Sequence, residues 1–227
     1  MHILAIDTSL GAAAAGLFDS DTRTEIAAES MAMERGHAEA LVPLIGRVLA
    51  RAEPAGLDLK RVVVTVGPGS FTGLRIGIAA ARGFALARGV PVVGVSTLSA
   101  YAAPFIAAND SSIVAVAIDA RHGEIYFQVF APGGRTMVSP RALSLREAAR
   151  AIGSGPVRLV GSGAPLLALE AWSLGVSAVV ADTQAAPDIA WVARLGAAAQ
   201  PEEALPRPLY IKKANATPQE AAALPRR

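Results

Sequence analysis

The chain has 227 residues, enough for one large domain or two small ones with a substantial core. It contains no cysteine, which excludes disulfides, thiolate metal sites, iron–sulfur ligation and cysteine nucleophiles. The composition is 52% hydrophobic but only 5% aromatic, because alanine is the commonest residue, so the mean hydropathy of +0.41 does not indicate a membrane protein. No apolar run reaches the roughly 18–20 residues of a spanning helix. The first residues lack the basic segment of a signal peptide, so we expect a cytoplasmic protein without membrane contact.

Charge is nearly balanced overall, at +2, but it is unevenly distributed along the chain. Residues 1–60 hold nine acidic and five basic side chains, whereas residues 61–90 hold four arginines and no acid. The sequence lacks the dense basic stripe of an autonomous nucleic-acid binder. We therefore expect any contact with RNA to be indirect, within an assembly.

Strands and helices alternate through the first half, which predicts an α/β fold with a partly parallel sheet. The predicted strands are residues 2–7, 12–19, 23–29, 61–66 and 91–95. The predicted helices are residues 36–51, 71–88 and 97–107.

The second half starts in the same way as the first. Its predicted strands are residues 113–119, 124–131, 157–160 and 178–180, and its predicted helices are residues 144–152 and 164–172. Residues 201–227 hold five prolines and are expected to be extended.

A short internal repeat connects the two halves. Leu-Ala-Ile-Asp ends at Asp7 and Val-Ala-Ile-Asp ends at Asp119, and in each copy a phenylalanine follows eleven residues later. The repeat predicts two similar lobes, with an aspartate at the carboxyl end of the first strand of each. Residues 1–107 are assigned to the first lobe and residues 108–205 to a reduced second lobe, with residues 206–227 returning to the first.

A glycine-rich turn at residues 67–73, Gly-Pro-Gly-Ser-Phe-Thr-Gly, leads from a strand into a helix. A helix amino terminus favours anions, but the Walker lysine is missing and no acidic residue ends the next strand to hold a ribose. Gly73 and Gly77 also lie inside the helix, at a cost of about 2 kcal/mol relative to alanine. Such a cost indicates close approach of another element, either from this chain or from a partner.

Candidate catalytic groups are few. The helix bearing His37 has leucine at position 41, so it lacks the second histidine of a helical metal pair. His122 lies in a predicted turn. Asp7 and Asp119 are suited either to hold a magnesium–phosphate group between two lobes or simply to cap their own turns.

Five segments, residues 3–9, 36–45, 67–77, 119–126 and 206–212, resemble in order the TsaB (YeaZ) family of bacterial threonylcarbamoyladenosine biosynthesis proteins. The resemblance implies an actin-like, ribonuclease-H-like fold of two lobes, the second reduced. It also implies a non-catalytic subunit that activates TsaD, the subunit that transfers threonylcarbamoyl to adenosine in tRNA. TsaD carries two metal histidines on its equivalent helix, and here His37 and Leu41 occupy those positions.

Further expectations follow from the same resemblance. The chain is expected to have no activity alone, no metal and no tightly bound cofactor, with ATP or ADP held only in the assembled complex. Asp7, Thr8 and Ser9 form a vestigial phosphate turn. The partners are TsaD, TsaE and, indirectly, tRNA, with a homodimer when the chain is alone. The interface with TsaD is expected on the first two helices, at His37, Leu41, Leu44, Val48, Phe71, Gly73, Arg75, Ile76, Gly77 and Ala80.

Two other functions compete with this interpretation. The first is an autonomous actin-like, ATP-dependent small-molecule kinase that uses Asp7 and Asp119 around Mg-ATP. The second is a glycoprotease-like peptidase, for which the sequence offers neither metal ligands nor a convincing base.

Overall fold

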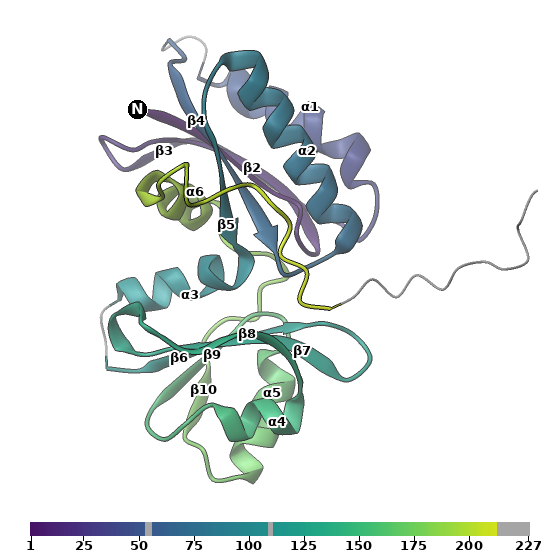
Figure 1. Ribbon diagram of the computed structural model, residues 1–227, viewed down its shortest axis with the longest axis vertical. Helices are drawn as coiled ribbons and strands as arrows, with labels where there is room; N and C mark the ends of the chain where they lie inside the picture. The colour runs from purple at the N-terminus through teal and green to yellow at the C-terminus, as the bar shows by residue number, and fades with distance from the viewer. Residues whose placement is uncertain (53–55, 109–110, 213–227) are drawn as a thin grey trace, which may run out of the picture.

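Two lobes, one above the other, make up the computed structural model, which describes residues 1–52, 56–108 and 111–212 (Figure 1). Each lobe is built on a five-stranded sheet, with strand order β3-β2-β1-β4-β5 in the first and β8-β7-β6-β9-β10 in the second. The two orders correspond strand for strand, with antiparallel pairs on one side and parallel pairs on the other. This shared topology agrees with the internal repeat, and the predicted α/β fold of two lobes is confirmed.

The first lobe contains β1 His2–Asp7, β2 Ala12–Asp19, β3 Thr24–Ala32, α1 His37–Ala50, β4 Leu59–Gly67, α2 Phe71–Arg88 and β5 Val92–Ser96. Helix α3, Thr97–Ala107, follows at the junction between the lobes. The second lobe contains β6 Ile113–Asp119, β7 Glu124–Phe130, the short 3-10 turn η2 Pro132–Gly134, β8 Thr136–Ser144, α4 Leu145–Ala151, β9 Val157–Val160, α5 Ala164–Ser173 and β10 Ala178–Val180. Helix α6, Ile189–Ala198, comes last.

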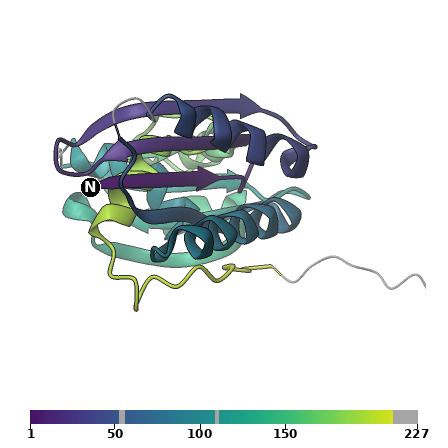
Figure 2. The same cartoon turned by 90° about the horizontal axis from the view of Figure 1, so that it is seen from above.

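Helices cover both faces of the first sheet. Alternate side chains of the strands point to opposite faces, so Leu4 and Val62 pack beneath α1 and α2, while Ile3 and Val63 pack beneath α6. Figure 2 shows α1 and α2 lying along the strands. The exposed sides of α1 and α2 therefore form one outer surface of this lobe.

Helix α6 lies on the first sheet, whereas the expected division had placed residues 108–205 in the second lobe. Ile189, Val192 and Ala193 are buried against that sheet. Arg61 of β4 holds the carboxyl end of the helix, because its guanidinium donates to the carbonyl oxygens of Gly196 over 2.6 Å and of Ala199 over 2.9 Å. The chain thus returns to the first lobe at α6, before residue 206.

Strand β8 and helix α6 have no counterpart among the elements predicted from the sequence. Strand β8 is an edge strand whose residues are exposed or half-buried, so the apolar alternation that marks a strand is weak. Helix α6 is rich in alanine, which blurs the contrast between its buried and exposed sides.

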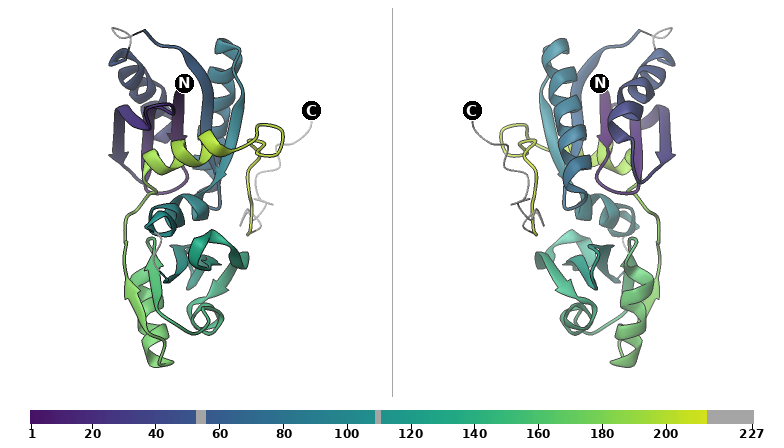
Figure 3. Two further views of the ribbon diagram at one scale, coloured as in Figure 1. Left: turned by 90° about the vertical axis from the view of Figure 1, so that its left-hand side faces the viewer. Right: turned by 90° about the vertical axis from the view of Figure 1, so that its right-hand side faces the viewer.

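Residues 201–212, here named the C-terminal strap, run without helix or sheet strand from α6 back over β5 and past α2. Figure 3 shows the strap and the link between β10 and α6 on opposite sides of the junction between the lobes. Residues 201–204 form a turn and residues 211–212 a bend, so the expected extended conformation is found only between them, and residues 213–227 lie outside the described part. No helix among the described residues is both long and apolar enough to cross a membrane.

Candidate functional site

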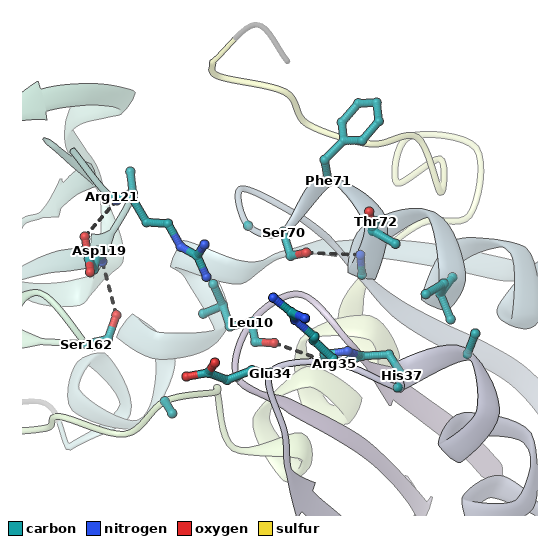
Figure 4. Close-up of a pocket in the computed structure, with 18 of the residues that line it drawn as sticks. Leu10, Glu34, Arg35, His37, Ser70, Phe71, Thr72, Asp119, Arg121 and Ser162 are labelled. Carbon is teal, nitrogen blue, oxygen red and sulfur yellow. Dashed lines mark hydrogen bonds between the residues drawn. The ribbon is translucent and has the colours of Figure 1, made fainter. Parts of the chain in front are cut away.

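A cleft of about 1000 Å³ lies between the lobes (Figure 4). The first lobe supplies the amino-terminal ends of α1 and α2 and the β1–β2 turn at Leu10 and Gly11. The second lobe supplies the β6–β7 turn, with Asp119 and Arg121, and Ser162.

The cleft carries charges of both signs. Arg35 and Arg121 extend into it from opposite lobes, and Glu34 and Asp119 line it as well (Figure 4). A carboxylate oxygen of Asp119 accepts a hydrogen bond from the backbone of Arg121 over 2.8 Å, which fixes the turn. The amino termini of α1 and α2 add partial positive charge, so the cleft is suited chemically to an anionic group between the two arginines.

Asp7 does not face the cleft. It is completely buried, and one of its carboxylate oxygens accepts hydrogen bonds from the Ser9 hydroxyl over 2.6 Å and from the Thr65 hydroxyl over 2.5 Å. The other oxygen is buried and has no partner within the described residues. Burial raises the pKa of Asp7, although the hydrogen bonds from Ser9 and Thr65 oppose the increase.

The amino-terminal end of α2 covers the turn of Asp7, Thr8 and Ser9. The Ser70 N–H donates to the carbonyl oxygen of Ser9 over 2.7 Å, and the Thr8 hydroxyl donates to the carbonyl oxygen of Gly73 over 2.7 Å. All three residues of the turn are buried and none lines the cleft. The chain itself therefore fills the turn that the resemblance implies to be a vestigial phosphate site.

His37 lies in the first turn of α1 and lines the cleft, but only 7% of its surface is exposed. Its Nε2–H donates to the carbonyl oxygen of Leu10 over 3.2 Å. Leu41, one turn further along α1, is fully buried in the core. Helix α1 therefore presents a single histidine, already hydrogen-bonded, where a metal pair would need two.

Comparison with known proteins gives the chain its family. The family model described as TsaD, tRNA N6-adenosine threonylcarbamoyltransferase, matches residues 29–202. The TsaB protein of Escherichia coli, named as a tRNA threonylcarbamoyladenosine biosynthesis protein, is 38% identical over 127 residues. The chain belongs to the TsaB (YeaZ) family.

Two further relatives extend the likeness along this TsaB-family chain. An uncharacterised protein of Mycobacterium tuberculosis is 38% identical over 163 residues, which is 72% of each chain. The solved structure of YeaZ from Pseudomonas aeruginosa superposes with a TM-score of 0.69 at 24% identity, covering 92% of this chain and 99% of that one. The match with E. coli TsaB covers 56% of this chain and 54% of that protein, so the chain spans about half the length of that relative.

The TsaB-family chain buries several of the residues that the sequence had suggested as a partner interface. Leu41, Leu44 and Val48 are fully buried in the core beneath α1, where they pack with Ile6 and Val64 of the sheet. Reaching them would require opening the lobe. These leucine and valine side chains are core residues, and their assignment to an interface is corrected.

Gly73 and Gly77 are also internal, because they face the β1–β2 turn of the same chain. A side chain at Gly73 would overlap the carbonyl oxygen of Thr8, and one at Gly77 would overlap the Thr8 hydroxyl. The close approach predicted from these glycines exists, but it is made by this chain. Among the other suggested residues, Phe71 and Arg75 are exposed, and Ile76 and Ala80 are half-buried.

Sequence reasoning missed an exposed surface on the same two helices. This α1–α2 surface, as we name it, comprises Val42, Gly46, Ala79, Gly83 and Leu86. Val42 is 56% and Leu86 is 86% exposed. A side chain built at Gly46 or Gly83 would meet nothing within 4 Å. The signal was present, because both are helix-interior glycines, like Gly73 and Gly77.

Proposed function

We propose that this TsaB-family chain is a non-catalytic subunit in the synthesis of threonylcarbamoyladenosine in tRNA, and that it activates a TsaD-type partner by docking through the α1–α2 surface. The family assignment supports the pathway, since the curated relatives are named for it. The observation that carries the docking proposal is the pair of exposed glycines, Gly46 and Gly83.

Each of these glycines weakens its helix by about 1 kcal/mol relative to alanine. At Gly73 and Gly77 the close approach of Thr8 explains the absence of a side chain. At Gly46 and Gly83 the described part of the chain offers no such neighbour. Close approach of a helix from another protein would supply one, and the exposed Val42 and Leu86 would add apolar area to that contact.

The cleft supports a role without catalysis. The turn at Asp7 is filled by the amino-terminal end of α2, and His37 is committed to the carbonyl oxygen of Leu10. An autonomous kinase would need Asp7 in the cleft beside Asp119, and only Asp119 lines it. The geometry therefore favours the subunit over the kinase.

The proposal extends to the remaining members of the assembly. It includes TsaE as a further subunit, tRNA contacts made mainly by the partner, and a homodimer through the same surface when the partner is absent. ATP or ADP would be held only in the complex, where Arg35 and Arg121 are the cationic groups of the cleft available to phosphates.

The docking proposal is tested by measuring affinity for the TsaD-type protein encoded in the same genome. Gly46→Gln and Gly83→Gln place a long polar side chain in open space, so both variants are expected to fold normally. Each is expected to weaken binding at least 100-fold in isothermal titration calorimetry, equivalent to about 2.7 kcal/mol.

A matched control is Leu169→Gln on α5, where the native side chain is 62% exposed on the other lobe. This variant is expected to bind like the unmodified chain. If the two glycine variants melt normally and bind normally, the docking surface lies elsewhere. If the unmodified chain transfers the γ-phosphoryl group of ATP to a small-molecule acceptor, releasing ADP, and Asp119→Asn abolishes this transfer, the kinase replaces the subunit as the proposed function.

A further inference from the structure

The C-terminal strap makes a connection between the lobes in addition to the covalent crossings that follow α3 and β10. It begins on the first lobe and ends on the second, on the opposite side of the junction from the link between β10 and α6 (Figure 3). Rotation of one lobe away from the other at this side would have to break the contacts at the end of the strap.

The first part of the strap is fixed on the first lobe by backbone contacts. The N–H of Gly94 in β5 donates to the carbonyl oxygen of Ala204 over 2.8 Å, and the N–H of Leu209 donates to the carbonyl oxygen of Val66 over 2.7 Å. A side chain at Gly94 would overlap the strap backbone at Leu205. The bond at Gly94 also covers the β5 edge of the first sheet.

Tyr210 of the strap packs against the amino-terminal end of α2. Its ring lies 5.0 Å from the ring of Phe71, and its hydroxyl accepts a hydrogen bond from Nε of Arg75 over 3.1 Å. The Arg75 guanidinium lies 3.8 Å from the centre of the Phe71 ring. The three side chains form one interlocked cluster at the first-lobe end of the cleft.

Lys212, two residues later, reaches the second lobe. Its ammonium group donates to the carbonyl oxygen of Ala120 over 3.2 Å and forms an ion pair with Glu124 at 2.5 Å. Ala120 lines the cleft, so this contact lies at the rim. Ile211 packs beside the apolar cluster between α3 and the second sheet.

We propose that the strap is a latch that holds the cleft at its observed width. The position of this latch depends on where the amino-terminal end of α2 holds Tyr210. Only Ile211 separates Tyr210 from Lys212, so a shift of Tyr210 on α2 must change the reach of Lys212 to the β6–β7 turn. The Lys212–Glu124 pair is partly exposed, with side-chain exposures of 24% and 44%. Such pairs are weak and are screened by salt, which makes the latch reversible.

A partner that touched Phe71 or Arg75 would act on the same latch and so change the cleft from outside. This consequence rests on the proposed function, whereas the latch itself does not. The test therefore uses the isolated full-length chain.

The width of the cleft is measured by pulsed electron double resonance between nitroxide labels at Ala50→Cys and Ser173→Cys. Because the natural sequence has no cysteine, these are the only two thiols. Both positions are exposed helical sites, one in each lobe. Dilution with unlabelled protein suppresses distances between molecules.

Lys212→Met and Tyr210→Ala are each expected to broaden the distance distribution and to add a component at longer distance. Adding 1 M salt to the labelled chain with an unchanged strap is expected to have the same effect. Lys60→Met is the matched control, since Lys60 pairs with Asp58 at 2.8 Å within one lobe, and it is expected to change nothing. Combining Lys212→Glu with Glu124→Lys is expected to restore the narrow distribution only in part, because the swap recovers the ion pair but not the hydrogen bond to the Ala120 carbonyl oxygen. An unchanged distribution in Lys212→Met, with a normal melting temperature, overturns the latch. If Lys212→Met broadens the distance distribution but Tyr210→Ala does not, the dependence of the latch on α2 is overturned.

Discussion

The Thr8 hydroxyl donates a hydrogen bond to the carbonyl oxygen of Gly73 over 2.7 Å, and the Thr8 carbonyl oxygen occupies the space that a Gly73 side chain would need. The two residues are 65 positions apart in the sequence. Their contact fixes the amino-terminal end of α2 on the β1–β2 turn, which removes Asp7 from the cleft and shapes the wall that a ligand would meet.

Gly73→Ala is expected to lower the free energy of unfolding by about 1–3 kcal/mol, because the added methyl group must displace the backbone of Thr8. Gly83→Ala in the same helix is the matched control and is expected to raise it by about 0.5–1 kcal/mol, since nothing lies near that position. Urea unfolding measures both. Equal effects of the two substitutions would show that Gly73 is not packed as described.

Arg61→Ala is expected to cost about 2 kcal/mol of folding free energy. The guanidinium donates to three carbonyl oxygens at the end of α6, those of Gly196, Ala197 and Ala199, and charged hydrogen bonds of this kind contribute about 1.5–3 kcal/mol. The exposed Arg135 serves as control, with a change to alanine expected to stay within about 0.5 kcal/mol. A loss in Arg61→Ala no larger than this control would contradict the proposed role.

Asp7→Asn is expected to change how stability depends on pH. The pKa of Asp7 is higher in the folded protein than in the unfolded chain. The contribution of Asp7 to the free energy of unfolding is therefore most favourable below its unfolded pKa, and it is lost as pH rises through the folded pKa. The native chain should therefore be more stable relative to Asp7→Asn at pH 4 than at pH 7. Chemical unfolding of both proteins across this range gives the difference, and a difference that grows with pH would reverse the assignment.

Chelation is expected to leave the melting temperature unchanged. The described residues contain no group of three or more side chains placed to bind a metal, and His37 is hydrogen-bonded to Leu10. Elemental analysis of the purified chain provides the second measurement. One zinc or iron per chain, lost in His37→Ala, would contradict this prediction.

Patterns dominated by a single physical signal predicted structure well. The apolar, β-branched run before Gly67 predicted a strand, and the glycine turn followed by small and apolar residues predicted α2 with the bounds that the structure shows, Phe71–Arg88. The two Asp-terminated strands, β1 and β6, begin sheets of identical order. Local sequence decides such elements because their burial and their turns are encoded within a few residues.

Contacts between distant segments could not be predicted in the same way. The spacing of Gly73 and Gly77 showed that something approaches the helix, but spacing does not say whether it is Thr8 or another protein. The apolar stripe of Leu41, Leu44 and Val48 suits either a core or an interface, and only the packed lobe separates the two. No sequence pattern marks Arg35 or Arg121 as site residues. Only the fold places both side chains at the cleft, from opposite lobes.

The return of α6 to the first sheet has a consequence for synthesis on the ribosome. Strands β6 to β10 are contiguous in the sequence, so the second lobe can fold as soon as its own residues emerge. The first lobe cannot, because the sheet face that carries Ile3, Val63 and Val93 stays uncovered until α6 has been translated. A chain truncated before Ile189 would leave that apolar face open to other nascent chains, and its expected fate is aggregation or capture by chaperones.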